Sequence, residues 1–174
     1  MPLCFLPNQK FEITDENGKR LNFEKQTKDS WIVETSKAKK IIVTYNYYSV
    51  DFNAGSTFLD NNVLYVNPVN CFIYIPEQIN EPCTVEIPKA KEEKIACGIN
   101  YKFGKIKAND YHELVDTPFL VSTRLQSKTY ESQGTNFTIW FYGECKPTWN
   151  ILLSDFKKFT DFQQKQFDDF PADQ

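Results

Sequence analysis

The sequence predicts a mainly β fold: an antiparallel β-sandwich or saddle-like sheet domain with one C-terminal amphipathic helix. Aromatic residues make up 16% of the 174 residues, with 15 Phe and 9 Tyr, and such side chains favour half-buried pleated surfaces. From residue 10 to residue 142, short apolar segments alternate with turn signals, which is typical of a sandwich rather than of βαβ units. After Thr148 the apolar spacing becomes that of a helix.

The first half of the chain contains strand-like segments bounded by turn residues. The Asn17-Gly18 dipeptide is a hairpin signal between the first two segments. In the longest segment, residues 40–50, apolar side chains occupy both alternating faces, so both faces are expected to be half covered. The predicted strands of this half are KFEIT (10–14), RLNFEK (20–25), WIVET (31–35), KIIVTYNYYSV (40–50), VLYVN (63–67), CFIYIP (71–76) and CTVEIP (83–88).

The second half adds further strands and then the helix. The strands are KIACGI (94–99), YKFGKIKA (101–108), PFLVSTRL (118–125) and NFTIWFYG (136–143). The helical spacing is carried by Trp149, Leu152, Leu153, Phe156, Phe159, Phe162 and Phe167. Thr148 is a plausible N-cap, and Pro171 lies past a plausible end. An apolar stripe of this kind needs a packing partner, which the chain does not obviously supply.

Charge and hydropathy exclude some classes of function. The formal net charge is −3 and the lysines are scattered among acids, which argues against a nucleic-acid partner. No apolar run approaches the roughly 20 residues of a membrane span. The start, MPLCFLPNQKF, lacks a basic region and is interrupted by prolines, so it does not resemble a signal peptide. The compartment stays open between the cytoplasm and export, the latter if the native N-terminus is missing.

Five cysteines are spread along the chain without a C-x-x-C pair, and there is one histidine. Structural zinc needs a denser set of ligands, so free buried thiols are expected instead. The five are Cys4, Cys71, Cys83, Cys97 and Cys145.

The histidine lies in NDYHELVDTPFL, residues 109–120. On a helix, His112 and Asp116 would share one face, but two ligands are too few for a metal and H-E-x-x-H is absent. The alternative is structural: Asp110 caps a single turn, Glu113 and His112 face solvent or a loop, and Pro118 ends the turn.

Other chemistry finds little support in the sequence. There is no G-x-S-x-G elbow and no glycine-rich phosphate loop. Paired carboxylates that meet only in space stay open. Tyr47, Tyr48 and Trp140 could form a stacking surface for a peptide or glycan, or could belong to the core.

Several segments, taken in order, resemble the N-terminal region of the glycyl aminopeptidase family, zinc metallopeptidases with an aminopeptidase N-like architecture and usually a PDZ domain. They are WIVET, VTYNYYSVDFNAGSTFLDNNVLYVNP, CFIY, PCTVEIP, DYHELVDTPFL, FYGECKPTW and DFKKFTDFQQKQFDDFP. The resemblance runs from about Phe11 to Pro171. Members usually have further strands and a Trp-Pro-Gly segment before the position of Phe11, which this chain lacks.

The resemblance implies that residues 1–146 are a non-catalytic β-sandwich N-terminal domain and that residues 147–174 form the helix opening a catalytic domain. That catalytic domain, on the same polypeptide, would carry H-E-x-x-H and zinc; no cofactor and no metal site is expected in this chain. In related enzymes this domain can lend a polar side chain to the substrate α-amine. The candidates here are Asn67, Asn70 and Glu144.

Three hypotheses therefore stand side by side. The favoured one is a non-catalytic domain of a zinc aminopeptidase that packs on the catalytic domain and shapes its substrate cleft. The second is a stand-alone β-sandwich module that binds peptide or glycan through exposed aromatics. The third is a small enzyme centred on His112, Glu113 and Asp116. A homodimer through the C-terminal helix is also expected, because the helix would otherwise expose its stripe.

Overall fold

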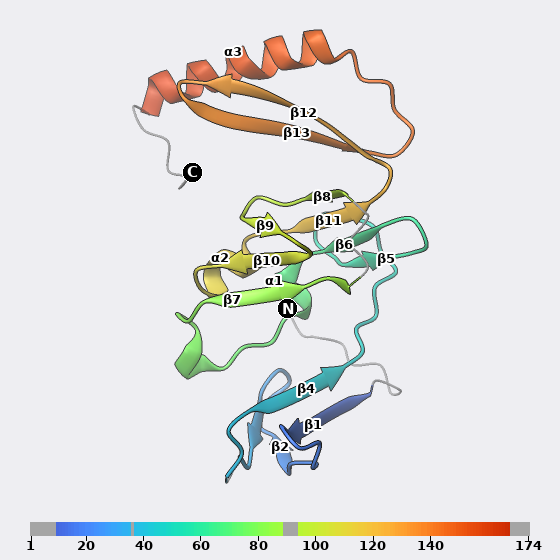
Figure 1. The fold of residues 1–174 in the computed structure, drawn as a ribbon, viewed down its shortest axis with the longest axis vertical. Coiled ribbons are helices and arrows are strands. Elements are labelled where there is room, and N and C mark those ends of the chain that lie inside the picture. The colour runs from blue at the N-terminus through green and yellow to red at the C-terminus, as the bar shows by residue number, and fades with distance from the viewer. Residues whose placement is uncertain (1–9, 36, 89–93, 168–174) are drawn as a thin grey trace.

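A computed structural model describes residues 10–35, 37–88 and 94–167. The described chain stacks three portions along its longest axis (Figure 1). The first four strands lie at one end, a two-sheet body with two short helices lies in the middle, and a long hairpin with one long helix lies at the other end. The fold is mostly antiparallel β with one C-terminal helix, as predicted.

The N-terminal portion combines one pairing between strands distant in sequence with one local hairpin. Strand β1 (Phe11–Asp15) pairs antiparallel with β4 (Ile41–Tyr45), and β2 (Phe23–Lys25) pairs with β3 (Trp31–Val33). The turn predicted at Asn17-Gly18 is confirmed, since Gly18 has a φ of 79°. The segment that follows the turn is nevertheless not the main partner of β1. It forms one isolated bridge with β1.

The middle portion contains a four-stranded sheet in the order β5-β6-β11-β8. Its strands are β5 (Phe58–Leu59), β6 (Leu64–Val66), β11 (Phe119–Ser122) and β8 (Lys94–Ala96). Val50 forms an isolated bridge with Phe58 at the β5 edge. All pairings in this sheet are antiparallel, so β11 brings the late part of the chain back between two earlier strands.

A three-stranded sheet in the order β7-β10-β9 completes the body. Its strands are β7 (Cys83–Glu86), β10 (Lys105–Ala108) and β9 (Tyr101–Lys102). Ile106 of β10 is fully buried and shares one apolar cluster with Val66, Phe119 and Val121 of the other sheet. Two antiparallel sheets therefore enclose one core, which is the sandwich that the sequence predicted.

The prediction of a strand at residues 71–76 is wrong. Helix α1 (Pro68–Cys71) ends inside this segment, and the 3-10 turn η1 (Pro76–Gln78) begins at its end. Backbone carbonyls that a strand would direct to a neighbour accept tyrosine hydroxyls instead: Tyr45 donates to Cys71 O and Tyr111 to Phe72 O. Two prolines at helix starts, a position that favours proline, also break the strand pattern.

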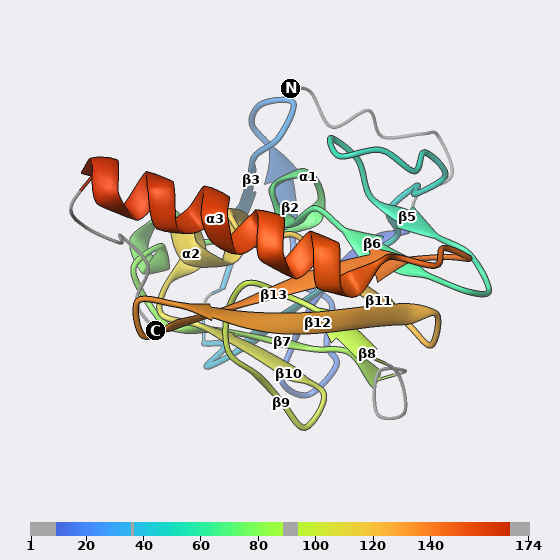
Figure 2. The ribbon, with the colours of Figure 1, turned by 90° about the horizontal axis from the view of Figure 1, so that it is seen from above.

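The C-terminal portion begins with a hairpin of β12 (Leu125–Ser132) and β13 (Thr135–Tyr142), in which Leu125 lies opposite Tyr142. Helix α3 (Trp149–Phe167) follows and runs over this hairpin (Figures 1 and 2). The predicted helix is confirmed, and Thr148 directly precedes it. Pro171 and the N-terminal segment MPLCFLPNQ lie outside the described residues.

The expectation that α3 lacks a partner is only partly right. Trp149 packs edge-on against Phe141 of β13, and Thr160 and Gln164, both buried, bond to side chains of β12. The helix therefore docks on the hairpin through a mixed, largely polar face. Several apolar side chains of the helix are left exposed, and three of them, Ile151, Phe159 and Phe162, share a face away from the docked one; Phe156 and Phe167 are exposed as well.

Among the described cysteines, all are free thiols. Cys71 is buried, Cys83 and Cys97 are half-buried, and Cys145 is exposed, so the expectation of burial is wrong for Cys145. Cys4 lies outside the described residues.

Candidate functional site

Two of the predicted site residues meet at one loop, residues 51–57. Asn67 precedes α1 and donates its amide Nδ2 to Ala54 O at 3.1 Å, and Asn70 within α1 donates Nδ2 to Gly55 O at 2.6 Å. The hydroxyl of Tyr65 on β6 also donates to Ala54 O, at 3.2 Å. Three side-chain donors thus hold two consecutive carbonyls. The sequence contains a Pro at the first position of α1, which fixes where Asn67 and Asn70 lie on this turn.

The loop also bonds within itself. Gly55 N donates to Asn53 Oδ1 at 2.9 Å, and Ser56 Oγ donates to Asp51 O at 2.7 Å. Thr57, which is buried, accepts from the backbone N–H of Asn67 at 3.2 Å. A surface loop with this many internal bonds has few conformations left to lose when a partner binds. It is therefore suited to present a fixed surface.

An aromatic cluster joins the loop to the C-terminal portion. The ring of Phe52 lies 5.0 Å from Phe58, 5.9 Å from Tyr65 and 5.8 Å from Tyr142 between centroids. Phe52 remains 51% exposed. Tyr142 ends β13, so the loop and the end of the hairpin lie next to each other. Sequence reasoning missed Phe52 and Tyr65, because only the strand register, Phe58 opposite Tyr65, brings these rings together.

Glu144, the third candidate, lies two residues beyond Tyr142 and after Gly143, whose φ is 96°. Its side chain is exposed. Within the described part of the chain, its carboxylate has no hydrogen bond and no ion pair. The structure therefore brings Asn67 and Asn70 together on the loop, and it leaves Glu144 as an uncommitted negative charge on the segment that follows Tyr142.

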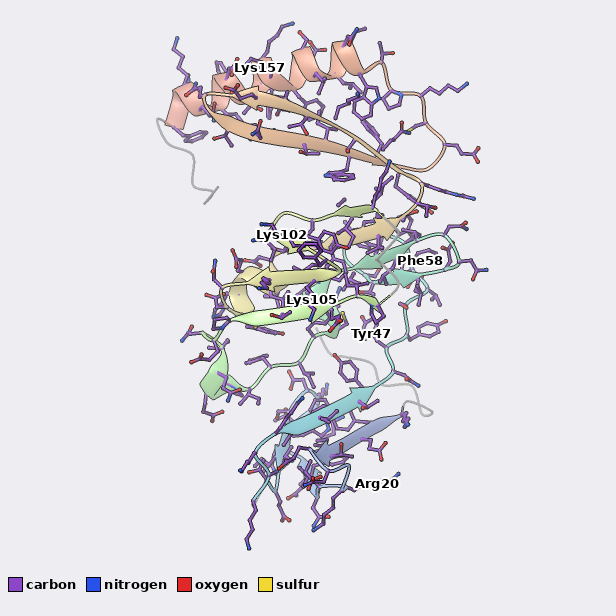
Figure 3. All side chains as sticks on the ribbon, viewed as in Figure 1. Arg20, Tyr47, Phe58, Lys102, Lys105 and Lys157 are labelled. Atoms are coloured by element: carbon purple, nitrogen blue, oxygen red, sulfur yellow. The ribbon has the colours of Figure 1, made fainter. Side chains whose placement is uncertain are left out.

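The proposed stacking surface is not built as one platform. Tyr47 packs against the core cluster, whereas Tyr48 is 61% exposed. Figure 3 places Tyr47 between β4 and the middle sheets and Phe58 within the four-stranded sheet. Trp140 is half-buried on β13, in the C-terminal portion. Successive side chains of an extended chain point to opposite sides, so Tyr47 and Tyr48 point in opposite directions.

The block around the histidine is a capped single turn, helix α2 (Tyr111–Val115). Asp110 accepts from Glu113 N at 2.8 Å, as the structural alternative predicted. Glu113 is half-buried and faces the preceding loop: its carboxylate accepts from the backbone N–H and from the side-chain amide of Asn109. His112 lies on the turn and Asp116 ends it, and Asp116 N bonds to His112 O at 3.1 Å.

Buried hydroxyls and a thiol near α1 are structural groups. Tyr45 bonds to Cys71 O, and burial raises the pKa of Tyr45 to about 12. Burial likewise raises the pKa of the Cys71 thiol and of Tyr111. All three stay protonated and neutral near pH 7, so none is prepared as a base or nucleophile.

The described residues contain no group of three or more His, Cys, Asp or Glu side chains able to hold a metal ion. These residues therefore do not fit a zinc ion. None of the helices in the described ranges combines the length and apolar character that spanning a bilayer requires.

Comparisons with known proteins agree with the resemblance noted above. The model of the Peptidase M61 N-terminal domain matches residues 8–123. The chain is similar to the crystal structure of an aminopeptidase N family protein from Idiomarina loihiensis, with a TM-score of 0.83 and 22% sequence identity. That similarity covers 94% of this chain and 29% of the other, so the chain spans less than a third of that protein. The comparison with curated proteins gave no match.

Proposed function

This chain belongs to the Peptidase M61 N-terminal domain family, and on that premise we propose that it serves a zinc aminopeptidase as the non-catalytic domain that packs on the catalytic domain and shapes the substrate cleft. Membership of this family makes the chain an N-terminal domain of a peptidase family. What we propose beyond this is that the chain packs on the catalytic domain and shapes its substrate cleft.

The observation that carries the proposal is the uncovered apolar face of α3. Phe159 is 60% exposed and Phe162 63% exposed, and Ile151 extends the same face. A run of exposed aromatic side chains on one helix face is a mark of a surface that another polypeptide covers. The opposite face of α3 already docks on the hairpin. The catalytic domain of the same polypeptide is the partner that we propose for the free face.

The anchored loop and Glu144 supply the proposed cleft-side contacts. The amide N–H groups of Asn67 and Asn70 are committed to Ala54 and Gly55, so we assign these two residues to positioning the loop. Glu144 keeps its carboxylate free, and a carboxylate is the group that binds the ammonium of a peptide N-terminus by charge-assisted hydrogen bonds. Water activation and zinc binding belong, in this proposal, to the catalytic domain.

The first test is the coding sequence downstream of Gln174. An in-frame H-E-x-x-H segment is expected there, and a stop codon with no such segment would refute the role in an active peptidase. The second test uses the parent enzyme with Glu144→Gln. The KM for a peptide with a free α-amine should rise about tenfold, the loss expected for about 1.4 kcal/mol of binding. The matched control is Glu131→Gln, on the hairpin, which should leave KM unchanged.

Packing of α3 has its own readout. In the parent enzyme the backbone amides of α3 should exchange with solvent deuterium more slowly than in the 174-residue chain, because a second domain would cover the helix. Equal exchange in the two proteins would contradict packing on α3 while leaving the substrate contact of Glu144 untouched.

A further inference from the structure

The turn between β12 and β13 sets the register of the hairpin, and the register determines which backbone N–H and C=O groups point outward from the hairpin. Gln133 has a φ of 49° and Gly134 a φ of 86°, which is a two-residue type I′ turn. Ser132 and Thr135 therefore exchange both of their ladder hydrogen bonds, and every second pair along the register does the same. The residues between them turn their backbone N–H and C=O groups outward, to the two free edges of the sheet.

The outer edge of β12 is closed at both ends by lysines. Lys157 on α3 donates to Glu131 O at 2.7 Å, and Lys94 on β8 donates to Leu125 O at 2.8 Å. Both carbonyls belong to the outward set. Figure 3 shows Lys157 on α3, beside the hairpin. Lysine at an edge is a usual way to prevent pairing with another chain.

The outer edge of β13 is left open. Its outward backbone groups belong to Asn136, Thr138, Trp140 and Tyr142, and no described residue forms a hydrogen bond with any of them. The strand, TNFTIWFY, contains no Lys, Arg, Asp, Glu or Pro and is rich in residues with high β propensity. An uncharged edge with outward backbone groups at four alternate residues is a site for strand addition.

We propose that this edge pairs antiparallel with β13 of a second copy of the chain. Self-pairing of β13 brings no like charges together, whereas self-pairing of β12 centred on Lys128 would place that lysine opposite its own copy. Antiparallel pairing of identical strands creates a twofold axis perpendicular to the sheet, so the interface is isologous. Both copies of α3 then lie on the same face of one continuous four-stranded sheet.

This assignment moves the expected homodimer contact from the helix to the strand. It is independent of the proposed peptidase role, because it concerns pairing between copies of this chain and needs neither substrate nor catalytic domain.

The test uses two proline variants of a single cross-strand pair, Thr138→Pro and Thr129→Pro. Thr138 lies opposite Thr129, and their hydroxyls are 3.0 Å apart, so both variants lose this same bond. Each proline removes an N–H that points outward, one from the β13 edge and the other from the β12 edge. Neither removes a backbone hydrogen bond inside the hairpin. Circular dichroism before and after heating checks that both variants fold alike.

Self-association of the full chain is measured by light scattering after size exclusion over about a hundredfold range of concentration. The wild-type chain and Thr129→Pro should dimerise equally. Thr138→Pro should bind at least about tenfold more weakly, since two symmetric hydrogen bonds are lost. Deuterium exchange should show the amides of Thr138 and Trp140 protected in the dimer only.

Three outcomes would overturn the proposal. The wild-type chain is monomeric at every concentration; Thr138→Pro dimerises as the wild type does; or Thr129→Pro loses the dimer to the same extent. A dimer that survives Thr138→Pro and is lost in Phe159→Ser would place the contact on α3 instead.

Discussion

The hydroxyl of Tyr130 lies 2.7 Å from Thr160 Oγ1, and this pair joins the middle of β12 to the middle of α3. Thr160 also bonds back to Phe156 O at 2.9 Å, so it links the helix backbone to the sheet. The long C-terminal helix is thus fixed by a hydroxyl pair as well as by the contact between Trp149 and Phe141.

Tyr130→Phe removes this bond and little else. The free energy of unfolding should fall by about 0.5–1.5 kcal/mol, because Thr160 is buried and loses one partner. Urea denaturation measures the change. Tyr48→Phe is the control, since the Tyr48 ring is exposed, and it should stay within about 0.5 kcal/mol of the wild type. Equal losses in both variants would mean that the pair does not hold α3.

Asn70→Asp should loosen the anchored loop. The amide donor to Gly55 O is replaced by a carboxylate that repels it, so the amides of residues 53–56 should exchange faster and limited proteolysis should cut there first. Asn46→Asp is the control, because the Asn46 side chain is exposed and anchors nothing in the described structure. Unchanged exchange at residues 53–56 would contradict the positioning role of Asn70.

Asp110→Ala tests the N-cap of α2. Loss of an N-cap typically costs about 0.5–2 kcal/mol of stability. Asp116→Ala, at the other end of the same turn, removes a carboxylate that bonds to no described residue and keeps the backbone bond of Asp116 to His112 O, so it should cost less than about 0.5 kcal/mol. Thermal or urea unfolding compares the two. A larger loss from Asp116→Ala would favour a binding role for that carboxylate.

Alkaline pH should weaken the fold through Tyr45. Burial raises its pKa from 10.0 to about 12, so between these values the unfolded chain releases a proton that the folded chain retains. This stabilising contribution is complete below pH 10 and is lost as pH rises towards 12. Tyr45→Phe should reduce the slope of stability against pH in that window. A phenolate absorbance that titrates fully near pH 10 would contradict the shift.

The positions of most elements could be predicted from local pattern, but their pairing could not. Alternation located β7, β10 and β13, and helical spacing located α3. The pairing of β1 with β4 joins Phe11 to Tyr45 across an intervening hairpin, and nothing local specifies it. The segment 71–76 has the apolar content of a strand, yet its carbonyls bond to Tyr45 and Tyr111, which lie far away in sequence.

The candidate site was predictable only in part for the same reason. Asn67 and Asn70 stand out as polar residues beside an apolar segment, but their acceptors are backbone carbonyls of Ala54 and Gly55, which leave no mark in a sequence. The aromatic cluster of Phe52 depends on strand register and on the return of β13. The N-cap at Asp110 could be predicted, because a capping aspartate accepts from a backbone N–H at a fixed spacing along the chain.

The two lysines that bond to carbonyls of β12, Lys94 of β8 and Lys157 of α3, also set the size of the proposed assembly. A hairpin with one open edge can add one copy and then has no edge left, so its growth stops at two. If Lys94 and Lys157 were both replaced by Ala, each copy would offer two edges and could add neighbours without end, as fibre-forming proteins do. By bonding to Leu125 O and Glu131 O, Lys94 and Lys157 therefore limit this assembly to a dimer and prevent growth into a polymer.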